Sequence, residues 1–434
     1  MVKVIGGGLA GCEAAWALAS RGIPVVLYEM KPLRFSPAHT KTGLCELVCS
    51  NSLKASRLGS ASGLLKAEMR RLGSFLLPIA EECAVPAGGA LAVDRDLFSE
   101  KITRAVEENP LITLCREPVD RFDPSEPTIV ATGPLTDGVL ASFLQENLIG
   151  TRLSFYDAAA PIVTRESLDF DRVFLAARYG RGDDDYINCP FDRESYRRFY
   201  DALISAESVP LEEVDRQFFK VYEGCMPVEV LAKRGEDAIR YGPLKPVGLT
   251  DPRTGKRPWA VVQLRRENAE GALYNLVGFQ TNLRFGEQQR VFSMIPGLEN
   301  AQFVRYGVMH RNTFLDSPRL LNADQSLRSH PNTFFAGQMT GVEGYMESAA
   351  SGLLAGIQMA RRLAGQTPLC LPRDTMLGAL TSYITDPNVP DFQPMGANMG
   401  ILPPPEKRIR DKQERYELLA ERSLRSLESY LQTI

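Results

Sequence analysis

The chain has 434 residues and a net charge of −3, and 44% of its residues are hydrophobic and 24% charged. These values are typical of a globular protein of two or three domains, and they exclude a protein that is basic throughout. No apolar stretch approaches the ~20 residues that a membrane-spanning helix needs, so we expect no membrane partner.

The eight cysteines and three histidines show no metal-binding spacing, so we expect no metal. The cysteines are scattered through a large chain, which favours reduced thiols over a disulfide framework. Because the first residues already enter a predicted strand, no room is left for a signal peptide, and we expect a cytoplasmic protein.

The segment Met1–Met30 carries the strongest signal. A short apolar strand is followed by Gly6, Gly8 and Gly11, an Ala-rich helix, a second strand over Pro24–Tyr28, and Glu29. In a dinucleotide-binding βαβ unit the first glycine permits a tight turn, the second lets the backbone approach a pyrophosphate, and the third lets the helix pack on the strand. The acidic residue binds a ribose hydroxyl. The alternative is a glycine-rich turn in an ordinary α/β protein.

A long polar segment follows, over Lys31–Ser62, and a loop of this length inside a domain is usually functional. We expect helices over Ser62–Leu77 and from Asp94, as the N-cap, to about Glu108. Short strands are expected at Leu91–Val93, Leu111–Cys115 and Pro127–Gly133.

From about Thr151 the pattern changes to that of an α+β insertion, which we place at residues 151–320. A helix is expected over Asp192–Glu207. Strands are expected at Ala158–Val163, Arg172–Tyr179, Tyr186–Cys189, Ala260–Leu264, Leu273–Phe279 and Gln302–Gly307.

The order of the first segment then returns late in the chain. A strand is expected over Asn332–Ala336, followed by a glycine-rich turn and by a helix over Ser348–Leu363. This repeat predicts that the first domain, residues 1–150, is completed late in the chain by residues 321–434. That last part ends in a charged amphipathic helix over Glu406–Leu431. The predicted fold class is therefore α/β with a Rossmann-like domain and an inserted α+β domain.

Several separate motifs resemble one family. Three segments resemble the flavin-contacting segments of two-dinucleotide-domain flavoproteins: Met1–Met30, Thr128–Gly133 and Phe334–Gly344. Four narrower motifs resemble the folate- and FAD-dependent tRNA (uracil-5-)-methyltransferases: Glu46–Ser52, Glu223–Glu229, Gly242–Leu249 and Phe392–Met395. The resemblance spans nearly the whole chain. The GidA-type tRNA-modifying flavoproteins share the fold and the late glycine-rich segment but lack this set of motifs.

The resemblance implies a Rossmann-like FAD-binding domain of the glutathione-reductase type. It implies FAD contacts for the following residues: Gly6, Gly7, Gly8, Leu9, Ala10, Gly11, Glu29, Thr132, Gly133, Gly337, Gln338, Gly341 and Gly344.

The resemblance also implies the reaction, in which carbon 5 of uridine 54 in the tRNA T loop is methylated to give ribothymidine. The one-carbon unit comes from 5,10-methylenetetrahydrofolate and passes by way of FAD, which NAD(P)H re-reduces. The cofactor carries the redox chemistry and the protein orients it.

Two cysteines match the family's catalytic positions. Carbon 5 of uracil becomes nucleophilic when a thiolate adds to carbon 6, a step that suits cysteine better than serine. Cys225 matches the nucleophile, and Cys49 matches a second cysteine that acts as a base or a partner thiol near the flavin. Four other cysteines are predicted to be small buried side chains: Cys12, Cys83, Cys115 and Cys370.

A basic cluster in the insertion predicts contacts with tRNA phosphates. It comprises Lys245, Arg253, Lys256, Arg257, Arg265 and Arg266. The alternative is an ordinary solvated surface, since Asp251 and Glu267 are interspersed. A uracil held out of the base stack would also need a flat aromatic partner, for which Tyr222 and Tyr345 are candidates.

Two other functions stay open. One is a GidA-type flavoprotein that modifies the wobble uridine together with a second protein subunit, and the other is a small-molecule FAD oxidoreductase without an RNA partner. The cysteine pair and the basic insertion favour the methyltransferase, for which we expect no obligate protein partner.

Overall fold

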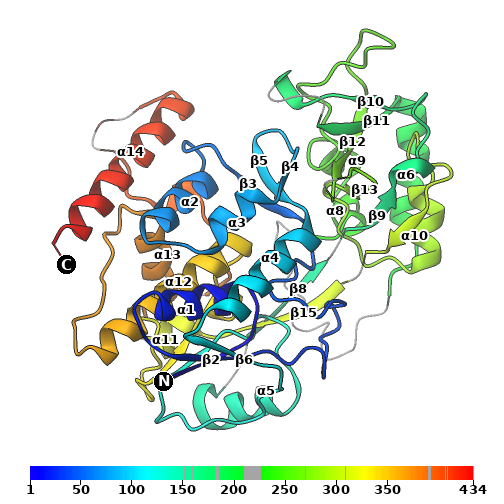
Figure 1. Cartoon of the computed structure of the whole chain (residues 1–434). Helices are drawn as coiled ribbons and strands as arrows, with labels where there is room; N and C mark the ends of the chain where they lie inside the picture. Colours follow the sequence, from blue (N-terminus) through cyan, green and yellow to red (C-terminus); the bar gives the residue numbers. More distant parts are fainter. Residues whose placement is uncertain are drawn as a thin grey trace.

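The computed structural model describes residues 1–150, 153–158, 160–180, 185–209, 226–268, 270–307, 309–389, 392–405, 407 and 409–433. Their strands form two larger sheets, which lie in different parts of the molecule (Figure 1). We call the five-stranded sheet the first sheet and the six-stranded sheet the second sheet.

The first sheet is parallel and has the strand order β16-β7-β1-β2-β6. Its central strand, β1, pairs with β2 on one side and with β7 on the other. The late strand β16 joins the edge beside β7, so the end of the chain completes a sheet that its beginning starts. The strands are β1 (Val2–Ile5), β2 (Val25–Tyr28), β6 (Ile112–Cys115), β7 (Thr128–Val130) and β16 (Thr333–Phe335).

Two helices from opposite ends of the chain pack closely beside this sheet. α1 (Leu9–Ala19) follows β1, and α12 (Tyr345–Leu363) follows β16. A Cβ on Gly352 would lie 2.0 Å from the carbonyl oxygen of Ala10, so the two backbones approach each other where α12 has no side chain. The other helices of this part are α2 (Ala61–Arg71), α3 (Leu76–Glu82), α4 (Arg95–Glu108), α5 (Gly138–Leu144), α11 (Ser317–Leu320), α13 (Met376–Thr385) and α14 (Lys412–Leu431).

Two buried glutamates tie these helices together. The carboxylate of Glu13 accepts hydrogen bonds from the N–H groups of Phe75 (3.1 Å) and Leu76 (3.2 Å), at the start of α3. Glu68 on α2 does the same for Met376 (2.7 Å) and Leu377 (2.8 Å), at the start of α13. Burial raises the pKa of each carboxyl to about 7, although these hydrogen bonds oppose the rise.

The second sheet has the order β10-β11-β12-β13-β9-β14, and its strand pairs are antiparallel. It has its own hydrophobic core, to which Phe191, Phe199 and Phe279 contribute. The strands are β9 (Ile162–Thr164), β10 (Phe174–Leu175), β11 (Tyr186–Phe191), β12 (Ala260–Arg266), β13 (Leu273–Leu276) and β14 (Phe303–Arg305), and the helices that accompany them are α6 (Arg193–Ser205), α8 (Val228–Ala232), α9 (Glu236–Arg240) and α10 (Phe285–Phe292).

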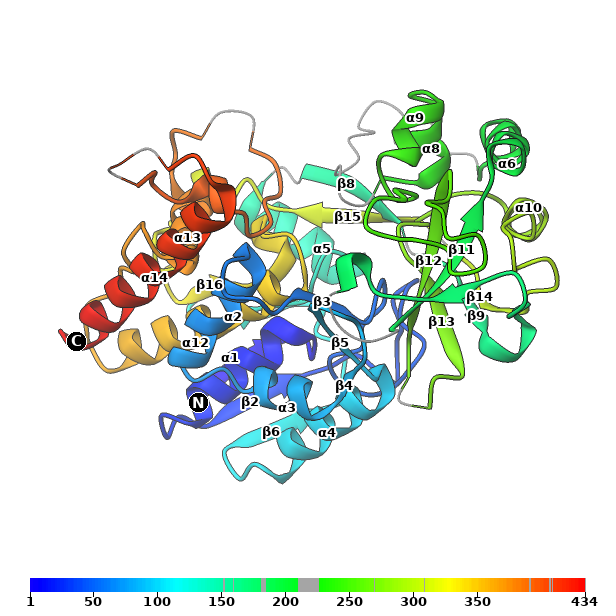
Figure 2. The same cartoon turned by 90° about the horizontal axis from the view of Figure 1, so that it is seen from above.

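An antiparallel pair of strands connects the two parts of the molecule. β8 (Leu153–Ala158) enters the second part and β15 (Met309–Phe314) returns from it, side by side in both views (Figures 1 and 2). A small antiparallel sheet of β3 (Ser52–Ala55), β5 (Ala90–Val93) and β4 (Ala84–Val85) lies in the first part.

The predicted α/β class is confirmed, with a first domain that the end of the chain completes and with an α+β insertion. The bounds of several predicted strands and helices differ. The predicted strand over Ala158–Val163 is wrong, because β8 ends at Ala158 and β9 begins only after Pro161, which has no N–H to donate. The strand over Arg172–Tyr179 shrinks to β10, and Tyr179 has a left-handed backbone (φ 59°). The last helix begins at Lys412 and not at Glu406, since the Asp411 side chain caps it by accepting from the N–H of Glu414.

Candidate functional site

The glycine turn after β1 is built as its spacing predicts. Gly6 has a φ of +110°, and a Cβ there would lie 2.5 Å from the carbonyl oxygen of Ala131 on the neighbouring strand segment. A Cβ on Gly11 would lie 1.8 Å from the Gly6 oxygen, so α1 packs directly on the turn. A Cβ on Gly8, in contrast, would meet nothing within 4 Å. The backbone at Gly8 therefore faces open space that a ligand can fill.

The N-terminus of α1 faces this space. Gly8 is the N-cap and supplies no side-chain cap, so the first N–H groups of the helix are available to an anion. Glu29, at the end of β2, is buried and accepts hydrogen bonds from the N–H groups of Gly7 (3.0 Å) and Lys31 (2.9 Å). The carboxylate is thus fixed beside the turn, with further lone pairs for a ribose hydroxyl.

A cavity that opens to solvent lies over the carboxyl ends of β1, β2, β7 and β16. This is where ligands bind in open α/β sheets. Ten of the residues predicted to contact the cofactor line it: Gly6, Gly7, Gly8, Leu9, Ala10, Glu29, Thr132, Gly133, Gly337 and Gln338.

Three other residues predicted to contact the cofactor do not line this cavity. Gly11 is covered by the turn, and Gly341 (φ +83°) lies against the Phe392 ring, 2.4 Å from where its Cβ would stand. Gly344 (φ +119°) is the N-cap of α12 and lies against the Lys54 and Glu347 side chains. These three glycines shape the backbone around the site, and their predicted cofactor contacts stay a prediction.

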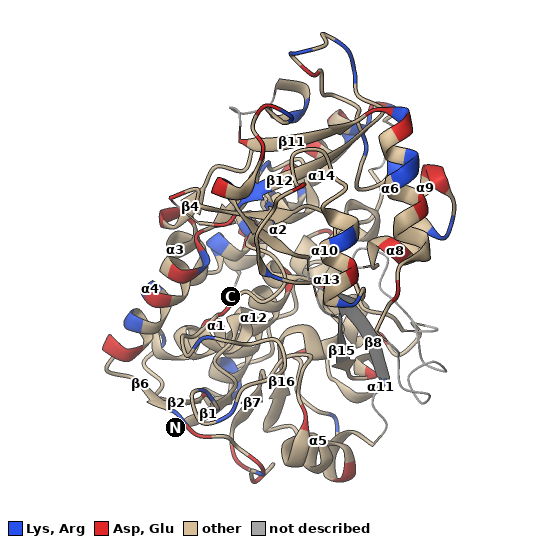
Figure 3. Cartoon of the chain, turned by 90° about the vertical axis from the view of Figure 1, so that its right-hand side faces the viewer, with Lys and Arg blue, Asp and Glu red and all other residues tan. Residues whose placement is uncertain are grey.

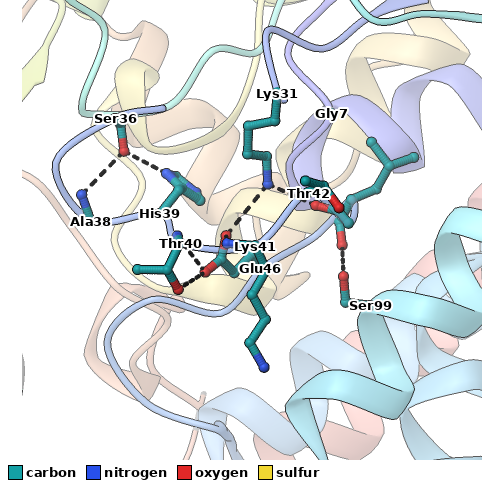
Figure 4. Close-up of polar contacts among 12 residues, drawn as sticks. Gly7, Lys31, Ser36, Ala38, His39, Thr40, Lys41, Thr42, Glu46 and Ser99 are labelled. Carbon is teal, nitrogen blue, oxygen red and sulfur yellow. Dashed lines mark hydrogen bonds and ion pairs between the residues drawn. The ribbon is translucent and has the colours of Figure 1, made fainter. Parts of the chain in front are cut away.

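The sequence pattern missed a polar wall of the cavity, formed by Lys31, Ser36, His39 and Glu46 (Figure 4). The buried Lys31 ammonium donates to the Gly43 carbonyl oxygen (2.7 Å) and lies 3.5 Å from a Glu46 carboxylate oxygen. The His39 ring contacts the Ser36 hydroxyl (2.5 Å), and burial and the charge of Lys31 lower the pKa of this histidine. The long polar loop after Glu29 was the signal, but no spacing within it identifies these side chains.

Cys49 lies beside this cavity. Its neighbour Val48 and the phenol of Tyr345 both line the cavity, and Cys49 itself is half-buried. The Tyr345 hydroxyl accepts hydrogen bonds from the N–H groups of Cys49 (2.8 Å) and Ser50 (3.3 Å). Burial raises the pKa of Tyr345, so its phenol is neutral. Cys49 therefore lies next to two residues that line the cavity.

Residues 1–367 match the family model of glucose inhibited division protein A, GidA. The chain is 55% identical over 433 residues to methylenetetrahydrofolate--tRNA-(uracil-5-)-methyltransferase TrmFO of Pelotomaculum thermopropionicum. It is 57% identical over 436 residues to the protein of that name from Geobacter sulfurreducens, and each alignment covers 100% of this chain and 99% of the relative. The chain belongs to the GidA family, on its TrmFO branch.

The fold agrees with that assignment. The structure of Aquifex aeolicus GidA in its form II crystal matches the chain with a TM-score of 0.67 at 17% identity, over 100% of this chain and 75% of that one. No helix in the described part of this TrmFO-family chain is long and apolar enough to cross a membrane.

The residue that the TrmFO motif assigns as nucleophile, Cys225, lies outside the described residues, as does Tyr222. The chain directly after it is anchored on the second part of the molecule. The N–H of Val228 donates to the carbonyl oxygen of Gln280 (2.7 Å), and the Glu229 carboxylate accepts from the Thr281 hydroxyl (2.8 Å).

The predicted basic cluster divides into an exposed group and a buried residue. Lys245, Arg253, Lys256 and Arg257 are exposed, and the ribbon of the second part carries several blue segments, which mark Lys and Arg (Figure 3). Arg266 is half-buried. Arg265 is buried, and its guanidinium donates to Asn51 and Ser50. Arg265 was predicted to contact RNA, and we correct this, because its donors are turned into the protein.

The predictions for the remaining cysteines are partly confirmed. Cys12 and Cys83 are buried as predicted. Cys115 is only half-buried, and Cys370 is exposed, so the prediction for Cys370 is wrong. Cys370 lies just before Pro372 in the connection that leads from α12 to α13, where the chain runs over the surface.

Proposed function

We propose that the chain methylates carbon 5 of a uracil in tRNA, with methylenetetrahydrofolate as the one-carbon donor. The observation that carries this proposal is the 55–57% identity, over the whole length, to proteins whose names state this activity. The structure of Aquifex aeolicus GidA shares the fold, but its sequence is only 17% identical to this chain. We therefore favour the methyltransferase over GidA-type modification of the wobble uridine. As the target we propose the uridine of the T loop that becomes ribothymidine.

We propose FAD as the resident cofactor, and the residues of the cavity fit it. The N-terminus of α1 can bind the pyrophosphate, because its N–H groups and the helix dipole favour negative charge. Glu29 can accept hydrogen bonds from a ribose, and Thr132, Gly133, Gly337 and Gln338 line the opposite side. When bound, FAD supplies the redox chemistry and the transfer of the one-carbon unit, and we propose NAD(P)H as the reductant.

The protein side of the reaction is assigned to two cysteines. The Cys225 sulfur forms a bond to carbon 6 of the uracil, which makes carbon 5 nucleophilic. After carbon 5 has gained the one-carbon unit, its proton leaves to a base and the bond between sulfur and carbon 6 breaks, which restores the Cys225 thiolate. Cys49 is the proposed base for that proton, since it lies beside the cavity.

The proposed phosphate contacts are four exposed basic residues and the half-buried Arg266. The four exposed residues are Lys245, Arg253, Lys256 and Arg257. They lie on the part of the molecule to which the chain after Cys225 is anchored. Because the substrate is tRNA, we place the enzyme in the cytoplasm, and we expect it to act without an obligate protein partner.

The test is methyl incorporation into an unmodified tRNA transcript with methylenetetrahydrofolate, FAD and NADPH or NADH. We expect incorporation that requires both the folate and the reductant. A matched transcript in which cytidine replaces the T-loop uridine should accept no methyl group. Incorporation that survives this replacement would overturn the proposed target, and a parent protein that incorporates nothing into either transcript would overturn the proposed activity.

A further inference from the structure

The loop Leu47–Asn51, which carries Cys49, is held by arginines from three separate elements. Arg95, the first residue of α4, donates to the carbonyl oxygen of Leu47 (2.8 Å). Arg305, at the end of β14, donates to the carbonyl oxygen of Val48. Two successive carbonyl groups of the loop are therefore fixed by guanidinium groups that lie far away in the sequence.

Arg265 on β12 fixes the other end of the loop. Its Nε donates to the Asn51 side-chain oxygen (3.0 Å) and its Nη2 to the Ser50 hydroxyl (2.6 Å). Asn51 in turn donates to the carbonyl oxygens of Val93 (3.1 Å) and Arg266 (2.8 Å). The loop is thus clamped between α4, β12 and β14, and we call Arg95, Arg265 and Arg305 the arginine clamp.

The charges around Cys49 do not balance while its sulfur is neutral. Arg265 is 8% exposed, and the Arg95 side chain is 15% exposed. Among the described residues, the acid that pairs with the clamp is Glu267, whose carboxylate lies 2.7 Å from Arg95 Nε. The Tyr345 phenol, which also faces Cys49, is neutral. Within the described part of the chain, three arginines therefore contact the loop, and one carboxylate, that of Glu267, pairs with them.

Buried charges are costly unless an opposite charge compensates them. The guanidinium groups stay protonated, because arginine is not deprotonated in proteins, although burial lowers the pKa of Arg265 and of Arg305. Both guanidinium groups interact electrostatically with Cys49. A thiolate at Cys49 would supply the missing negative charge.

We propose that the arginine clamp positions Cys49 and holds its sulfur as a thiolate at neutral pH. The inference rests on the proposed function in one respect, that Cys49 is a catalytic cysteine. A thiolate can accept a proton directly, which favours the role of base over that of a partner thiol. The clamp residues act through Cys49 and are positioning residues.

The test is the pH dependence of the alkylation of Cys49 by iodoacetamide in the FAD-loaded protein, without tRNA or folate. Peptide mapping by mass spectrometry separates Cys49 from Cys225 and from the exposed Cys370. In the parent protein the rate should be half-maximal below about pH 7, well under the ~8.5 of an unperturbed thiol. In Arg265→Met the midpoint should rise by at least about one pH unit, so that alkylation at a pH well below both midpoints slows about tenfold.

Three further variants separate charge from structure. Arg265→Lys keeps the charge and should keep a midpoint close to that of the parent. Arg305→Gln removes a charge on another strand and should raise the midpoint, which provides a second measurement if Arg265→Met does not fold. Arg198→Met, on the exposed surface of α6 and paired with Glu194, should change nothing.

If Arg265→Met and Arg305→Gln bind FAD and keep the parent's midpoint, the clamp has only a structural role and the proposal is wrong. The proposal is also wrong if the parent's midpoint lies above about pH 7, because Cys49 is then mostly a neutral thiol at neutral pH. Because the titration uses neither substrate, its result is independent of methyl transfer. A parent protein with a depressed midpoint that methylates no tRNA would overturn the proposed function and leave the electrostatic role of the clamp in place.

Discussion

The glycine turn and the Cys49 loop lie on the same cavity but are built in different ways. The turn is made by local backbone geometry, in which Gly6 and Gly11 are required because a Cβ at either position would collide with backbone atoms. The Cys49 loop is held by side chains that come from α4, β12, β14 and α12. A turn made by neighbouring residues produces a recognisable spacing in the sequence. A loop held by side chains from distant elements produces no such motif.

The largest effect should come from the cysteines. Cys225→Ala should lower the methylation rate by at least about 100-fold, because carbon 5 of the uracil is no longer activated. Its FAD content and its NAD(P)H oxidation with oxygen should be unchanged, since the glycine turn lies elsewhere in the chain. The measurements are methyl incorporation, flavin absorbance and oxygen-dependent NAD(P)H consumption.

A tRNA that carries 5-fluorouridine separates the roles of the two cysteines, because fluorine cannot leave carbon 5 as a proton does. The parent protein and Cys49→Ala should form a covalent adduct with this RNA, and Cys225→Ala should not. An adduct in Cys225→Ala together with none in Cys49→Ala would mean that the two roles are reversed. Unchanged methylation in both variants would exclude cysteine nucleophilic catalysis.

The next effect contrasts two glycines of one turn. Gly11→Ala places a Cβ 1.8 Å from the Gly6 oxygen and should destabilise the fold by about 3 kcal/mol or more. Gly8→Ala meets no protein atom within 4 Å, so thermal unfolding should be close to that of the parent. We expect Gly8→Val to weaken FAD binding strongly, because its side chain points into the space that the pyrophosphate needs. Gly8→Val with undiminished FAD affinity would show that the cofactor does not approach this backbone.

The glycine turn and the Cys49 loop also show which parts of the fold and the site can be predicted from the sequence. The parallel strands, the glycine turn and the Asp94 cap of α4 follow from patterns within a few residues, and the structure contains all of them. Arg265 shows the opposite case. It stands among basic residues that look solvated, but the pairing of β12 with β11 places it opposite Tyr186 and under the Cys49 loop. That pairing, and hence its burial, depends on contacts that no local pattern encodes.

A smaller effect concerns the exposed basic residues of the second part. The double charge reversal Lys256→Glu and Arg257→Glu should weaken tRNA binding and leave the FAD content unchanged, because neither residue lines the cavity. For every phosphate that the variant no longer binds, the dependence of log affinity on log salt concentration should flatten by ~0.7–0.9. The double variant Arg197→Glu and Arg198→Glu, at two exposed positions on α6, is the matched control, because it changes the net charge by the same amount. A slope equal to that of the parent would show that this surface is merely solvated.

The smallest effect tests the buried carboxyls of the first part. The pKa of Glu13 and that of Glu68 are about 7 in the folded chain, mainly through burial, against 4.5 for the ordinary group. The folded state therefore holds these protons more tightly, and the contribution of these two groups to stability is fully present below pH 4.5 and is lost as the pH rises to 7. Each group should contribute a loss of up to about 3 kcal/mol over this interval.

Glu68→Gln removes one of these titrating groups, so its melting temperature should fall less steeply between pH 4.5 and 7 than that of the parent. Its absolute stability should also be lower, because an amide nitrogen replaces one of the oxygens that accept from Met376, Leu377 and Ser423. The steepness of the curve and not its height is therefore the quantity to compare. Glu421→Gln, an exposed position on α14, should reproduce the parent's steepness. If Glu68→Gln does so too, the Glu68 carboxyl ionises in the folded protein as it does in the unfolded chain, and its hydrogen bonds fully offset its burial.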